Sequence, residues 1–203
     1  MLLFAHTGIT LGLALGLDKA LPKRVPFLRR GEESEGSANP SRLAAVAGAV
    51  DYRLVLVGSM LPDIIDKPVG IYLIPSISNG RIFCHTLLFF LVLLLVGLYR
   101  YLRYRRTGIL VLSLCSGFHL VLDQMWRSPK TLFWPLYGLA FDKYDLSYWL
   151  PGMWEALIRE PTVYGPEVVG IVILVPVALE LLRSGNLLRF LKSGVVKWTT
   201  TTS

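Results

Sequence analysis

Five apolar stretches, separated by polar segments, follow one another along the chain. They cover residues 2–17, 43–61, 82–99, 108–125 and 168–182. Such runs are typical of helices in a membrane, although about 20 residues are needed to span the hydrocarbon core and several runs are shorter. We therefore expect either that some helix ends are polar or that some helices enter the bilayer only part way. The pattern predicts an all-α integral membrane helical bundle of about five helical segments, folded as one domain over residues 1–203.

The polar segments between these runs differ in character. Residues 18–42 are rich in Gly, Ser, Pro and charge, a composition that cannot bury a core, and they are predicted to form a mobile loop. Pro62 begins a second predicted loop that extends to Gly80. Residues 131–166 mix aromatic side chains with Pro, Gly and charge, which favours the membrane interface. Residues 184–203 are predicted to be a basic C-terminal tail.

The composition supports a membrane environment. Hydrophobic residues make up 53% of the chain and charged residues only 17%, whereas a soluble domain carries about 25% charged residues. The formal charge of +7 is not collected on a soluble face, as nucleic-acid binding requires, but lies beside the apolar runs. We expect membrane lipid as a partner and no nucleic acid, and the sequence leaves the oligomeric state open.

The distribution of basic residues predicts the topology. Fourteen of the 21 Lys and Arg residues lie in residues 18–42, in the turn at 100–107 and in the segment from Arg183 onward. Cytoplasmic loops carry an excess of Lys and Arg, so these segments, including the 18–42 loop, are predicted to be cytoplasmic. The N-terminus and the opposite helix ends are then extracytoplasmic in a multi-pass protein of the cell membrane.

Seven ionisable residues fall at this predicted outer end. They are His6, Asp63, Asp66, His85, His119, Asp123 and Glu167. The set contains all three histidines of the chain. Ionisable residues near a membrane span are costly and usually functional. Their placement on one side predicts a metal site at the outer end of the bundle.

Residue types and spacing indicate more than one ion. His119 and Asp123 are four residues apart and share a helix face, so an imidazole and a carboxylate can approach a common ion. Three histidines with up to four carboxylates exceed the needs of one tetrahedral zinc. For Asp66 a cap or turn role is an equally good interpretation, and so is a helix-start role for Glu167 beside Pro166. Arg81 is suited either to a phosphate or to lipid headgroups.

Four short motifs resemble a known family. They are His6-Thr7, Leu61-Pro62-Asp63-Ile64-Ile65-Asp66, Arg81 with His85-Thr86, and His119-Leu120-Val121-Leu122-Asp123. Their order and spacing resemble the YdjM-like (DUF457) membrane-bound metal-dependent hydrolases over roughly the first 140 residues. That family is distantly similar to zinc-dependent phospholipase C and P1 nuclease. The resemblance implies an all-helical fold in which His6, Asp63, His85, His119 and Asp123 bind zinc ions that hydrolyse phosphoesters.

The motifs and the resemblance together lead to a functional expectation. We expect a membrane-bound metal-dependent hydrolase that cleaves a phosphoester of a lipid or lipid-linked substrate by metal-activated water. The cofactor is a divalent metal, expected to be zinc, with Glu167 as a further candidate ligand. Asp63 or Asp66 is the candidate general base, and Arg81 the candidate charge stabiliser. The alternatives are a non-enzymatic membrane protein that binds or transports metal, and a scaffold held together by metal.

Overall fold

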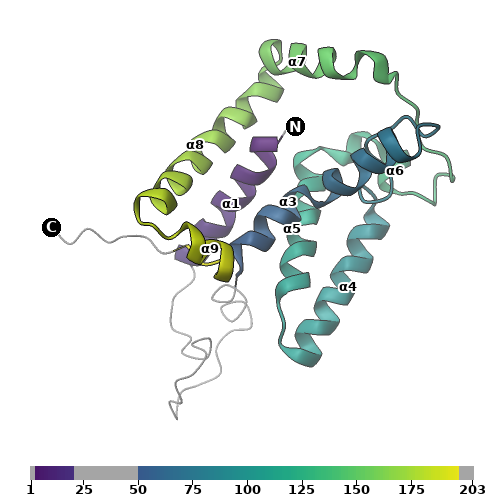
Figure 1. Ribbon diagram of the computed structural model, residues 1–203. Helices are drawn as coiled ribbons and strands as arrows, with labels where there is room; N and C mark the ends of the chain where they lie inside the picture. The colour runs from purple at the N-terminus through teal and green to yellow at the C-terminus, as the bar shows by residue number, and fades with distance from the viewer. Residues whose placement is uncertain (1–2, 21–49, 197–203) are drawn as a thin grey trace.

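The structure, a computed structural model, describes residues 3–20 and 50–196 (Figure 1). Within these ranges the chain forms helices and connecting loops, with no strand. The longer helices are α1 (Leu3–Ala20), α3 (Tyr52–Lys67), α4 (Leu87–Tyr104), α5 (Gly108–Leu122), α7 (Trp149–Arg159) and α8 (Pro161–Arg183). Shorter elements are a π-helical turn (Pro68–Leu73), 3-10 turns at Met125–Arg127 and Leu146–Tyr148, α6 (Pro129–Leu132) and α9 (Leu187–Ser193).

The long helices pack in the order α8, α1, α3, α5, α4 (Figure 1). Helices α1 and α8, which are far apart in sequence, touch at Gly8 and Gly170, where a Cβ on either glycine would collide with the backbone of the other helix. A similar close approach joins α3 to α5, because a Cβ on Gly58 would lie 2.9 Å from the Cβ of Cys115. Small residues thus allow the backbones to approach closely, as is common between helices in membranes.

Two helices of the described part are long and apolar enough to cross a membrane, namely α4 and α8. Helix α4 packs against α5 and leaves much of its apolar surface exposed, including Leu91, Val92 and Leu95. Shorter apolar helices cover Leu3–Asp18 and Gly108–Leu122. Each of the five predicted apolar segments therefore overlaps a helix, while the number of membrane crossings stays a prediction.

The loop predicted from Pro62 to Gly80 is wrong as far as Leu73, whereas residues 74–80 do form a loop. Helix α3 continues through Pro62 to Lys67 and is followed directly by the π-helical turn. Proline cannot donate a backbone hydrogen bond, but tertiary packing holds the helix together, here against α5. The helix begins at Tyr52, capped by the Asp51 carboxylate, which accepts from the Arg53 backbone N–H at 3.0 Å. Asp63 and Asp66 consequently lie on the last turns of a helix.

Other boundaries also differ from the prediction. Helix α4 begins at Leu87, where Thr86 caps it by accepting from the Phe89 N–H, so His85 lies in the preceding loop. Helix α8 begins at Pro161, and Glu167 is inside it and does not open it. The aromatic segment 131–166 contains α7, and the predicted tail contains α9. Residues 21–42 of the predicted mobile loop, and 197–203 of the tail, lie outside the described residues.

The interior of the bundle is apolar at one end. The hydrophobic core gathers side chains from α1, α3, α5, α8 and α9: Leu11, Tyr52, Val55, Val111, Cys115, Val177, Leu181 and Phe190. The turn between α4 and α5 and the end of α8 lie toward the same end of the molecule (Figure 1). These are basic segments that the sequence predicts to be cytoplasmic, so their grouping at one end agrees with that topology, although the side of the membrane stays a prediction.

Candidate metal centre

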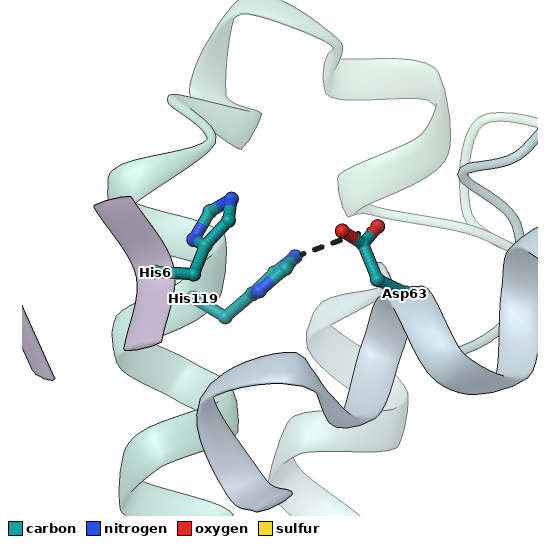
Figure 2. A group of neighbouring side chains, drawn as sticks. All are labelled: His6, Asp63 and His119. Atoms are coloured by element: carbon teal, nitrogen blue, oxygen red, sulfur yellow. Dashed lines mark ion pairs between the residues drawn. The ribbon is translucent and has the colours of Figure 1, made fainter. Parts of the chain in front are cut away.

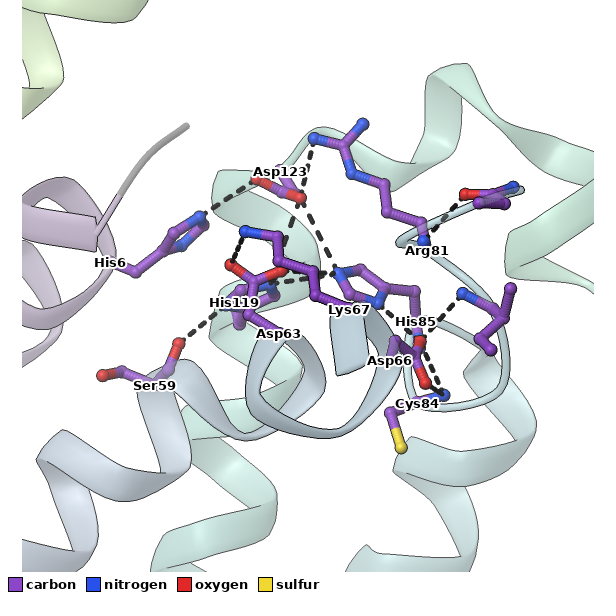
Figure 3. A network of polar contacts seen from close by, with 12 residues as sticks. His6, Ser59, Asp63, Asp66, Lys67, Arg81, Cys84, His85, His119 and Asp123 are labelled. Carbon is purple, nitrogen blue, oxygen red and sulfur yellow. Dashed lines mark hydrogen bonds and ion pairs between the residues drawn. The ribbon is translucent and has the colours of Figure 1, made fainter. Parts of the chain in front are cut away.

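The opposite end of the bundle buries a cluster of histidines and aspartates (Figure 3). Helix α1 brings His6, α3 brings Asp63 and Asp66, the loop before α4 brings His85, and α5 with the residue that follows it brings His119 and Asp123. The three histidines and Asp66 are fully buried. Five of the predicted ligands thus come together from four separate parts of the chain.

The His85 ring is fixed by Asp66. The Asp66 carboxylate accepts hydrogen bonds from the backbone N–H groups of Ile82, Cys84 and His85 at 2.8 to 3.1 Å. It also lies 2.7 Å from His85 Nδ1, which must carry the hydrogen because the carboxylate can only accept. Asp66 therefore holds both the loop and the imidazole, and leaves Nε2 as the nitrogen that faces the cluster.

The His119 ring is fixed in the same manner. Its Nδ1 lies 2.7 Å from the backbone carbonyl oxygen of Ser59 on α3. A carbonyl oxygen only accepts, so Nδ1 carries the hydrogen and Nε2 holds a lone pair. The Nε2 atoms of His119 and His85 face each other at 3.3 Å. Two facing lone pairs repel, so a cation, either a proton or a metal ion, belongs between them.

Two aspartates surround this pair of nitrogens. Asp63 Oδ1 lies 3.5 Å from His85 Nε2 and 4.0 Å from His119 Nε2. Asp123 Oδ2 lies 3.9 Å and 4.0 Å from the same two nitrogens. Both carboxylates are almost fully buried. Two imidazole nitrogens and two carboxylate oxygens therefore converge on one small volume.

His6 approaches this volume from α1 (Figure 2). Its ring stacks on that of His119, with centroids 4.0 Å apart and planes inclined by 20°. Its Nε2 lies 3.0 Å from Asp123 Oδ1, while its buried Nδ1 has no hydrogen-bond partner within the described residues. A buried ring nitrogen without a partner is unusual in a folded protein and fits a ligand position.

Two cations complete the charge balance at the rim. Lys67 Nζ lies 2.7 Å from Asp63 Oδ2, and Arg81 Nη2 lies 2.9 Å from Asp123 Oδ2. The side chain of Lys67 is 35% exposed and that of Arg81 is 43% exposed, unlike the buried residues that they contact. Asn79 positions Arg81, because its side-chain oxygen accepts from the Arg81 backbone N–H at 2.8 Å.

The protonation of two groups follows from these contacts. Burial disfavours a charged His85, but its hydrogen bonds with Asp63 and Asp66 outweigh burial and raise its pKa. Burial also disfavours a charged Asp123, yet the hydrogen bond with His6 and the charge of Arg81 hold its pKa below the usual range. The carboxylate is therefore an anion, ready to accept a cation.

The donor set fits a divalent ion. Two groups of residues offer ligand atoms that all lie within 4.8 Å of one another: His6, Asp63 and His119, and His85, His119 and Asp123. Zinc–nitrogen bonds of about 2.0–2.1 Å in a tetrahedron place two nitrogens about 3.3 Å apart, which matches the separation of His85 and His119. The hydrogen bonds of His85 to Asp66 and of His119 to Ser59 are the outer contacts that orient histidine ligands.

Two predicted site residues have other contacts. Asp66, a candidate general base, is committed to the 82–85 loop and lies in neither ligand group. Glu167, a candidate ligand, also lies outside both groups among the described residues. Its Oε2 accepts from the backbone N–H groups of Phe4 and Ala5 at 2.9 and 3.2 Å, so it caps α1 just before His6.

Sequence reasoning missed Lys67, Ser59 and Asn79 as members of the site. The spacing of four residues between Asp63 and Lys67 was a usable signal, since such pairs meet on a helix. The contacts of Ser59 and Asn79 depend on a backbone carbonyl and on a loop conformation, for which the sequence holds no comparable pattern.

Fold and site together describe a helical membrane protein with a buried histidine and aspartate cluster that could hold a metal ion. Residues 1–187 match the model of the family described as YdjM inner membrane protein, and the chain belongs to this family. Comparison with curated proteins and with solved structures gives no match. The predicted family resemblance is confirmed, whereas the likeness to phospholipase C and P1 nuclease stays a prediction.

Proposed function

We propose that the chain is a membrane-bound metal-dependent hydrolase that cleaves a phosphoester of a lipid or lipid-linked substrate. The main support for a metal site is that the Nε2 atoms of His85 and His119 face each other at 3.3 Å. Their other ring nitrogens are already occupied by Asp66 and Ser59. Both lone pairs must therefore be used at the same point, beside two carboxylates, which is a ligand set suited to zinc.

Asp63, His85, His119 and Asp123 would hold the divalent ion, which would contribute an activated water near neutral pH and stabilisation of phosphoryl charge. The chain's own residues hold and orient the reacting groups. Asp63 is the remaining candidate for the general base, because Asp66 accepts four hydrogen bonds and is fully buried. Asp66 serves as a positioning residue for His85.

The second candidate is a non-enzymatic protein that binds or transports the same ion. A transport path requires polar groups through the depth of the helices. Here the interior opposite the cluster gathers apolar side chains such as Leu11, Val55 and Val177, and the buried polar groups along α1 and α5 beyond the cluster are uncharged hydroxyls such as Thr10 and Ser113. This arrangement favours a site open to one face over a path across the membrane. A third candidate, a metal-held scaffold, requires that the fold depend on the ion.

The test measures metal content per chain by mass spectrometry of detergent-purified protein, in the wild type and in a His119→Ala, Asp123→Ala double variant. Glu155→Gln, an exposed change on α7, is the control. We expect at least one divalent ion per chain in the wild type and in the control. The double variant should show a sharp fall, because His119 belongs to both ligand groups.

A screen of phosphoesters with and without chelator then separates the candidates. Metal-dependent turnover supports the hydrolase. Metal binding without turnover, in a double variant that keeps its helical circular dichroism, supports the non-enzymatic candidate. A double variant that binds no ion and has lost its helical signal supports the scaffold. A wild type without metal after reconstitution overturns the proposal.

A further inference from the structure

Lys67 and Arg81 are the two cations that contact the carboxylates of the cluster. They come from different elements, the end of α3 and the loop before α4, yet each pairs with a carboxylate oxygen of a different candidate ligand, Asp63 or Asp123. Figure 3 shows both side chains reaching over the carboxylates from the same side. Both are partly exposed while the groups below them are buried. The two cations therefore form the rim between the cluster and its surroundings.

The charge of the cluster changes when a metal ion binds. Without an ion, the two cations leave one negative charge in excess on the carboxylates of Asp63, Asp66 and Asp123. A divalent ion makes the cluster net positive. The carboxylates then share their charge with the ion, so the ammonium and guanidinium groups can accept an incoming oxyanion. Anion binding and metal binding must strengthen each other.

The segments that carry the two cations also expose apolar side chains. Exposed hydrophobic side chains lie next to both cations in the sequence: Ile64 and Tyr72 near Lys67, and Phe83 near Arg81. In addition, α4, a candidate membrane span, begins at Leu87, only six residues after Arg81. Arg81 is thus placed near the end of a span, at the depth where headgroup phosphates lie. Exposed apolar side chains beside paired cations suit a phosphate that carries acyl chains better than a free one.

We propose that Lys67 and Arg81 form a phosphate-binding pair that receives the headgroup phosphate of a phospholipid above the metal centre. This inference rests on the proposed function, because it places the substrate on the same ion. Guanidinium groups bind phosphate through two parallel hydrogen bonds, and lysine adds a compact charge. The pair defines the substrate class as a membrane lipid with an accessible phosphoryl group.

The experiment uses the full chain in a phosphate-free detergent, with and without added zinc. Two probes are compared by isothermal titration calorimetry: inorganic phosphate and dihexanoyl phosphatidic acid, which carries the same group on short acyl chains. The variants are Lys67→Gln and Arg81→Gln. Lys130→Gln is the matched control, since Lys130 also pairs with an aspartate, Asp142, but on an exposed surface. Metal content is measured for every sample.

We expect the zinc-loaded wild type to bind the short-chain lipid more tightly than phosphate, and the metal-free protein to bind neither. Each rim variant should retain its metal and lose about tenfold in affinity for both probes, as expected for one charge-assisted hydrogen bond. The control should match the wild type. If both rim variants keep their affinity for the two probes, the phosphate-binding role of Lys67 and Arg81 is overturned. Loss of metal from the rim variants also overturns it, because the two cations then belong to the ion site.

Equal affinity for phosphate and for the lipid overturns the lipid assignment. Failure of the proposed function is recognised separately, because a wild type that takes up no zinc removes the centre before any anion is added, and a wild type that binds zinc but turns over no phosphoester is not a hydrolase.

Discussion

The two ends of the bundle bury opposite kinds of side chain on the same helices. On α1, α3, α5 and α8 the interior at one end consists of residues such as Leu11, Val55 and Val177. At the other end these helices bury His6, Asp63, His119 and Glu167. Close packing of large apolar side chains stabilises a helical bundle even in lipid, whereas buried ionisable groups cost free energy unless they are paired.

This difference separates stability from function. The apolar end can hold the helices together by packing alone. At the polar end most of the buried ionisable groups are paired with one another or with backbone groups, as Asp66 is with the 82–85 loop and His119 with Ser59. We infer that changes at the apolar end alter unfolding but not metal binding, and that changes at the polar end alter metal binding first.

The largest effect is expected from His119→Ala. This residue belongs to both ligand groups, whereas His6 belongs to one of them. His119 has one free ring nitrogen, Nε2, so it can bind one ion, and metal content measured by mass spectrometry should fall to background in His119→Ala. His6→Ala should retain more of the bound metal. Equal losses in the two variants contradict a larger role for His119 than for His6.

The apolar end is tested by Leu11→Ala. Leu11 is almost fully buried in the core, whereas Leu13 on the same helix is 48% exposed. Loss of a buried leucine costs about 2–5 kcal/mol, and loss of an exposed one about 0.5 kcal/mol or less. Denaturant unfolding of Leu11→Ala and of the control Leu13→Ala in detergent should show this difference in the free energy of unfolding. The metal content should be unchanged in both variants. If Leu11→Ala loses metal at temperatures where it stays folded, metal binding at the polar end depends on packing at the apolar end.

The gathering of the candidate ligands was predictable from the sequence, and their detailed contacts were not. Apolar runs define helix ends, and alternating chain direction brings His6, His85 and His119 to the same end. The role of Asp66 was hidden because Pro62 indicated a loop, whereas packing of α3 on α5 carries the helix through it. With the helix continued, Asp66 faces the 82–85 loop and Lys67 reaches Asp63.

A smaller effect is expected from Asp66→Asn, which tests the positioning role. The amide keeps the shape of the side chain but replaces one accepting oxygen by a donor, which then faces the N–H group of Ile82 or of Cys84. Loss of such an outer contact typically weakens metal binding by about 10–100-fold. Competition with a zinc chelator should show this weakening with the stoichiometry unchanged. The control Asp142→Asn, an exposed aspartate paired with Lys130, should behave as the wild type.

The smallest effect is expected from Glu167→Gln, which decides between the sequence interpretation and the contacts in the structure. A glutamine oxygen can still accept from the Phe4 and Ala5 N–H groups, so the cap on α1 is largely kept. Metal stoichiometry and affinity should therefore stay within about twofold of the wild type, with a stability change of about 1 kcal/mol or less. A metal ligand behaves differently, because a neutral amide is a poor substitute for a carboxylate in a zinc site. Loss of one ion in this variant, measured by mass spectrometry, assigns Glu167 to the centre and extends the site onto α8.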